Sequence, residues 1–147
     1  MSKVVTANLE QQRDFRFAIH FSDGMPDLYG DEPPPLGNAT GPSPSQLLVA
    51  AVGNCLSDSL LFALRKFKQN PEPIKTSVAA TIDRNAENRL RITDITVKLT
   101  LGVPKDALAH LDRALGQFEE FCTVSQSVRQ GIPVAVEVYD STGLRLK

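Results

Sequence analysis

Residues 41–69, GPSPSQLLVAAVGNCLSDSLLFALRKFKQ, form the longest apolar stretch of the chain. Ser43 suits the N-cap, Pro44 the first helical position, and Gln46 completes a Ser-x-x-Gln capping box. We therefore expect a helix over 44–68, which ends before the proline-containing sequence NPEP. Its apolar residues cover more than one stripe of the helix, as is typical of a helix packed on several sides. In a chain of 147 residues, a second subunit is the expected source of this additional cover.

The segments on either side of this helix predict antiparallel strands. Residues 1–32 include DFRFAIHF, in which apolar and polar side chains alternate, and we expect a β-meander there. Residues 33–43 are rich in proline and glycine and predict a loop. Residues 74–140 predict a hairpin, two helical segments and a closing strand, PVAVEVYD, in the order ββααβ. The whole chain, residues 1–147, is thus predicted to be one α+β domain.

Composition and charge exclude several classes of protein. Hydrophobic residues make up 41% of the chain and charged residues 22%, and the formal net charge is −1. This balance gives no electrostatic attraction to nucleic acid or to an anionic membrane. Asn54 and Asp58 interrupt the apolar run, and an Asp in the middle of a membrane span is costly, so we expect a buried core helix. The N-terminus shows no signal peptide, which favours a cytoplasmic protein with reduced thiols.

Cys55 lies in the middle of the predicted helix and admits two interpretations. Cysteine is among the residues most often buried, and a packed, inert thiol is the simpler one. The other is a buried nucleophile, which requires a thiolate. Burial and the neighbouring Asp58 both disfavour that charge, and the start of the helix is about three turns away, too far for its dipole to help. A reactive Cys55 therefore needs a cation from another part of the fold.

The remaining candidates for chemistry are Cys122, His20 and His110. No two of the cysteines and histidines lie close in sequence, so a zinc site is not expected. A thiol hydrolase would require one histidine beside Cys55, and the sequence does not place either there. No glycine-rich phosphate loop or dinucleotide fingerprint is present. We therefore expect neither a metal nor an organic cofactor.

Two segments resemble the OsmC/Ohr family, the proteins of osmotic induction and organic hydroperoxide resistance. Residues 41–60, GPSPSQLLVAAVGNCLSDSL, are similar to the central-helix signature of the family. Residues 121–138, FCTVSQSVRQGIPVAVEV, are similar to its second-cysteine segment. The resemblance implies an OsmC-like fold, in which antiparallel sheets surround long central helices in an intertwined homodimer. It also implies a stress-response thiol peroxidase that reduces organic hydroperoxides at sites in the dimer interface.

The resemblance also implies roles for individual residues. Cys55 would be the peroxidatic cysteine, oxidised by the peroxide to a sulfenic acid, and Cys122 would resolve it as a disulfide. A dithiol reductant, of the lipoyl type for example, would then restore both thiols. The cation would be an arginine of the RDFR segment, with Arg13 as the first candidate and Arg16 as the second.

One position departs from the family pattern. The hydroperoxide-resistance branch carries a glutamate that holds the catalytic arginine, whereas Ser45 stands there in this chain. Asp14, Glu119 and Glu120 are the acids that would have to replace it. Two hypotheses follow: a thiol peroxidase, or a non-enzymatic OsmC-like dimer that binds a small apolar ligand or senses oxidants.

Overall fold

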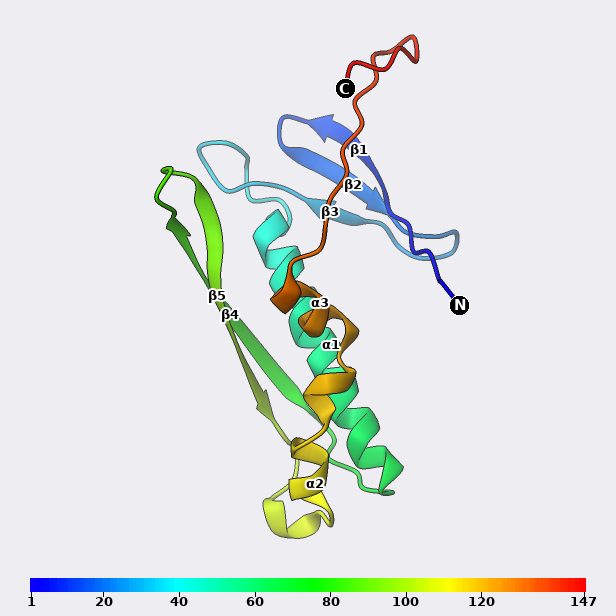
Figure 1. The fold of residues 1–147 in the computed structure, drawn as a ribbon, viewed down its shortest axis with the longest axis vertical. Coiled ribbons are helices and arrows are strands. Elements are labelled where there is room, and N and C mark those ends of the chain that lie inside the picture. The colour runs from blue at the N-terminus through cyan, green and yellow to red at the C-terminus, as the bar shows by residue number, and fades with distance from the viewer.

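The long helix α1, Pro44–Lys66, is the element around which the rest of the chain is arranged (Figure 1). The computed structural model describes all residues 1–147. A three-stranded antiparallel sheet precedes α1, a two-stranded hairpin follows it, and short helices come last. The remaining elements are β1 Asn8–Arg13, β2 Arg16–His20, β3 Leu28–Gly30, β4 Lys75–Arg84, β5 Leu90–Thr100, η1 Lys105–Ala107, α2 Leu111–Leu115, η2 Phe118–Phe121 and α3 Thr123–Gln130.

Helix α1 begins where the sequence predicts. Ser43 Oγ accepts a hydrogen bond from the backbone N–H of Gln46 at 3.2 Å, and Gln46 Oε1 accepts one from the N–H of Ser43 at 2.9 Å. These reciprocal bonds satisfy backbone donors that the first turn of a helix leaves free, so the predicted capping box is confirmed. The helix ends at Lys66, two residues earlier than predicted.

The elements pack on α1 in two groups. The β4–β5 hairpin runs along one side of the helix, and η2 and α3 run along another (Figure 1). The sheet β1–β2–β3 lies near the N-terminal end of α1. Its strands pair antiparallel, with Leu9 opposite Ile19 and Ile19 opposite Leu28. The predicted mixture of antiparallel strands and a long helix is confirmed.

The segment from 104 to 121, which the sequence predicts as one helix, is broken into three short pieces. His110 adopts a left-handed backbone conformation with φ of 59°, which no α-helix continues. The N–H of Ala109 donates to Gln69 Oε1 at 2.8 Å, and the His110 ring stacks on Phe67 with centroids 4.9 Å apart. These contacts to the end of α1 replace the helical hydrogen bonds at this point.

The last predicted strand does not form within this chain. Residues 132–137 pair with no strand of the chain. Val138 exchanges backbone hydrogen bonds with Leu146 and Lys147, and an isolated bridge joins Tyr139 to Arg145. Val134 and Val136 alternate with polar or small residues as expected of a strand, yet they are 82% and 59% exposed. A strand needs a neighbouring edge to complete its hydrogen bonds, and the single chain offers none here.

The core of the single chain is small. Only 13 of the 147 residues are buried, and the largest buried side chains include Leu60 and Leu64. Phe62 and Phe121 are 65% and 71% exposed. By length and composition α1 could also cross a membrane, which is weak evidence because a core helix of a soluble protein passes the same test. Its packing against the hairpin and α3 agrees with the core helix predicted from the sequence.

Candidate functional site

Two thiols from distant parts of the sequence meet where α1 and α3 pack together. Cys122 is fully buried, with an exposed fraction of 0%, and packs with Val52 and Leu56 of α1. Cys55, partly exposed, packs against the same cluster. The two thiols are close enough for each to shift the pKa of the other. Both cysteines are free.

Cys122 occupies the N-cap of α3. Its Sγ accepts a hydrogen bond from the backbone N–H of Ser125 at 3.4 Å. The four-residue segment CTVS therefore places a sulfur where serine or threonine oxygens usually satisfy the first N–H groups of a helix. The dipole of α3 adds a partial positive charge at this end. A negative charge on Cys122 is accordingly favoured by its position.

The surroundings of the two thiols shift their pKa values in opposite directions. For Cys55, burial is the main cause of a raised pKa, and the hydrogen bond to Cys122 and the charge of Asp58 act in the same direction. For Cys122, burial opposes ionisation, but hydrogen bonds from Cys55, Ser125 and Ser59 outweigh it and lower the pKa. Within one chain, Cys122 is thus the better thiolate and Cys55 the better proton donor.

The arginines predicted to reach Cys55 lie elsewhere in this chain. Arg13 ends β1, on the sheet near the N-terminal end of α1, whereas Cys55 lies in the middle of that helix. Arg16 is held by neighbours in its own sheet and loop. Its guanidinium donates to Gln12 Oε1 at 2.7 Å and to Thr40 Oγ1 at 2.7 Å, and lies over the ring of Tyr29 at 4.4 Å. The single chain therefore brings the two cysteines together without either arginine.

Of the acids considered as replacements for the missing glutamate, one has an arginine partner. Glu119 Oε1 lies 3.4 Å from Nη2 of Arg129, which belongs to α3. The sequence analysis missed Arg129, and it also missed Ser59 and Ser125. Ser125 could have been found, because a CTVS segment before a helix marks an N-cap residue and the N–H three positions later. Arg129 and Ser59 carried no comparable signal.

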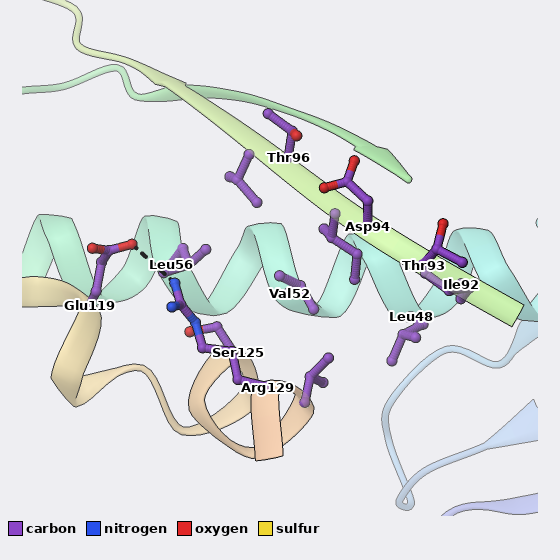
Figure 2. A pocket seen from close by; sticks show the side chains of 13 residues that line it. Leu48, Val52, Leu56, Ile92, Thr93, Asp94, Thr96, Glu119, Ser125 and Arg129 are labelled. Atoms are coloured by element: carbon purple, nitrogen blue, oxygen red, sulfur yellow. Dashed lines mark hydrogen bonds and ion pairs between the residues drawn. The ribbon is translucent and has the colours of Figure 1, made fainter. Parts of the chain in front are cut away.

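A groove of about 700 Å³ opens between α1, β5 and α3 (Figure 2). Leu48, Val52 and Leu56 form its floor, and the pair Glu119–Arg129 crosses its end near η2. Neither thiol lines this groove, although Ser125, whose N–H donates to Cys122 Sγ, does. A smaller cavity of about 80 Å³ lies farther along α1. It is lined by Ser59, Phe62, Ala63, Lys66, Phe67, Gln117 and Phe121.

The histidines have partners other than the thiols. His20 Nδ1 lies 2.9 Å from Asp27 Oδ1 and its Nε2 lies 3.5 Å from Asp23, while His110 stacks on Phe67. A thiol hydrolase would need one of them beside Cys55, and the structure does not put it there. No group of three or more His, Cys, Asp or Glu side chains is arranged to hold a metal ion.

Comparison with known proteins agrees with this fold. The sequence profile of the family described as OsmC-like protein matches residues 37–137. This chain therefore belongs to the OsmC-like family. No curated protein is similar enough in sequence to match.

Solved structures share the fold at low sequence identity. An OsmC-like protein of unknown function from Vibrio cholerae is 18% identical, with 86% of this chain and 94% of that chain covered and a TM-score of 0.70. The organic hydroperoxide resistance protein OsmC from Legionella pneumophila is 17% identical, with 86% and 90% covered and a TM-score of 0.65. The organic hydroperoxide resistance protein OhrB of Bacillus subtilis is 18% identical, with 90% and 95% covered and a TM-score of 0.60. At these identities the solved structures show a shared fold.

Proposed function

We propose that this protein is a thiol peroxidase that reduces organic hydroperoxides with the cysteine pair Cys55 and Cys122. The observation that supports the proposal is the packing of the two thiols in one apolar cluster, with Cys55 partly exposed on α1 and Cys122 buried at the N-cap of α3. A sulfenic acid formed on one thiol would have its resolving partner in the same cluster.

The reaction follows from this pair. The Cys55 thiolate attacks one oxygen of the hydroperoxide, the O–O bond breaks, and the alcohol leaves after taking up a proton. Cys55 is then a sulfenic acid. The Cys122 thiolate attacks that sulfur, water leaves, and a disulfide forms. A dithiol, for which a lipoyl-type compound is a candidate, reduces the disulfide and restores both thiols.

The cation that Cys55 requires would come from a second copy of the chain. A homodimer is supported by the small core of the single chain, by the exposed Phe62 and by the unpaired segment 132–137. In such a dimer Arg13 is the better candidate, because Arg16 is already bound to Thr40 and Tyr29. The apolar residues that pack around Cys55, among them Val52 and Leu56, favour alkyl or lipid hydroperoxides over hydrogen peroxide. The two free thiols fit a reducing, cytoplasmic location.

Turnover of cumene hydroperoxide with excess lipoyl-type dithiol tests the proposal. We expect Cys55→Ser to abolish turnover, and Cys122→Ser to permit one oxidation of Cys55 without formation of the intramolecular disulfide. Equal turnover in wild type and Cys55→Ser would refute the peroxidase.

The second candidate function is a non-enzymatic dimer that senses oxidants or binds a small apolar ligand. Ser45, at the position of the family's glutamate, and the raised pKa of Cys55 favour it. It predicts a slow, stoichiometric oxidation of Cys55 and no repeated turnover with any of several peroxides and dithiols.

A further inference from the structure

The two thiols differ in how a reductant can reach them. Cys122 is fully buried by its own chain, under α3 and against Val52 and Leu56 of α1, while Cys55 is partly exposed. A second copy of the chain could add cover to Cys55 but could not uncover Cys122. An external thiol that enters the site therefore meets the sulfur of Cys55 before that of Cys122.

The two thiols also differ as leaving groups. Cys122 Sγ accepts the N–H of Ser125 at 3.4 Å and lies at the positive end of α3. The Ser59 hydroxyl, one turn after Cys55 on α1, also lowers the pKa of the Cys122 thiol. In thiol–disulfide exchange the sulfur that forms the more stable thiolate leaves faster. Access and leaving-group stability thus select the same direction of attack.

We propose that the reductant attacks Cys55 of the Cys55–Cys122 disulfide and that Cys122 leaves as a thiolate held at the N-cap of α3. A thiolate of the dithiol forms a bond to Cys55 Sγ, the Cys55–Cys122 bond breaks, and its electron pair stays on Cys122. The second thiol of the reductant, deprotonated, then attacks the first sulfur of the reductant, which is bonded to Cys55. The bond to Cys55 breaks, and Cys55 is released. The dithiol is oxidised by two electrons, and its two protons pass to the two cysteines. This inference rests on the proposed cysteine pair but not on its reaction with peroxide.

The direction of attack can be read directly from the mixed disulfide. Wild-type protein is oxidised to its intramolecular disulfide with diamide, mixed briefly with glutathione, a monothiol, and quenched in acidic denaturant. Free thiols are then alkylated, and peptide mass spectrometry identifies which cysteine carries glutathione. We expect glutathione on Cys55 and the alkyl group on Cys122.

Three results would overturn the proposal: glutathione on Cys122, an even distribution over the two cysteines, or no intramolecular disulfide with diamide. Diamide forms the disulfide without any peroxide, so this experiment does not depend on peroxidase activity. If glutathione is found on Cys55 but the protein turns over no hydroperoxide, the peroxidase proposal is refuted and the direction of attack stands.

A serine pair on α1 tests the stabilisation of the leaving thiolate. Ser59→Ala removes one donor toward Cys122, and we expect reduction of the disulfide to slow by about threefold to tenfold. The equilibrium with dithiothreitol should also shift toward the disulfide, because the reduced form loses stabilisation. Ser57→Ala is the matched control, since the Ser57 hydroxyl bonds Gly53 O and Thr76 on another face of the helix. Equal behaviour of the two variants, at equal Tm, would overturn the assignment of Cys122 as a stabilised leaving group.

Discussion

Gly53 of α1 packs directly against the side chain of Val78 of β4, so that a Cβ at position 53 would overlap Cγ2 of Val78. A glycine inside a helix costs about 1 kcal/mol relative to alanine, and this contact is the reason it is tolerated. The close approach lets the β4–β5 hairpin lie on α1 two residues before Cys55.

Gly53→Ala should lower the free energy of unfolding by about 1–2 kcal/mol, although alanine is the better helix former, because the added methyl group forces the hairpin away from α1. Chemical denaturation measures the change. The double variant Gly53→Ala/Val78→Ala removes the overlap and should recover most of the loss, less the cost of the smaller valine site. If Gly53→Ala stabilises the protein instead, the hairpin can move away from α1 at no cost, and the Gly53–Val78 contact does not determine its position.

Asp31 should make the loop before α1 sensitive to acid. Its side chain is 2% exposed and accepts hydrogen bonds from the N–H groups of Glu32, Asn38 and Thr40 and from the Thr40 hydroxyl, which together lower its pKa to about 2. Because the folded-state pKa lies below the unfolded one, this stabilisation is complete above about pH 4 and is lost as the pH falls toward 2.

Asp31→Asn should therefore lower Tm at pH 7 by several degrees and flatten the dependence of Tm on pH between 4 and 2. Thermal unfolding across that range measures both effects. Asp23→Asn is the control, because Asp23 is fully exposed and contacts only His20, at 3.5 Å. If Tm depends on pH in the same way in the wild type and in Asp31→Asn, the buried carboxylate is not the source of the acid sensitivity.

Ser45→Glu should raise peroxide turnover several-fold if the peroxidase proposal holds, because it restores the acid that the family resemblance places there. The first turn of α1 contains no acidic residue, so a glutamate also interacts favourably with the helix dipole, by about 0.3–1 kcal/mol. Ser45→Gln is the control, because glutamine has the same side-chain length as glutamate but carries no charge. Equal turnover in the Glu and Gln variants would mean that position 45 does not govern the arginine.

Arg13→Ala should raise the pKa of Cys55 in the assembled protein, because a neighbouring cation lowers the pKa of a thiol. The rate of alkylation by iodoacetamide as a function of pH measures that pKa, in a Cys122→Ser background so that only one thiol reports. Arg16→Ala should instead lower Tm, since it frees Thr40 and Tyr29. An unchanged Cys55 titration in Arg13→Ala would exclude this arginine as the cation.

The features that the sequence predicted correctly depend on near neighbours. The capping box joins Ser43 to Gln46, three residues apart, and the hairpin pairs strands separated by a short turn. The cluster that holds Cys55 and Cys122 joins residues far apart in the chain, so only the family resemblance could bring them together. The break at His110 escaped prediction for the same reason, because Gln69 and Phe67 of a distant segment cause it.

The unpaired segment 132–137 has a consequence for how this protein is handled in solution. An unpaired edge rich in valine is a template for any other extended chain, and correct pairing competes with aggregation. If a second copy supplies its partner strand, folding and assembly become one equilibrium, and the measured Tm rises with protein concentration. Stability values obtained at a single concentration would then describe the mixture of species in the tube, and dilution alone would weaken the protein.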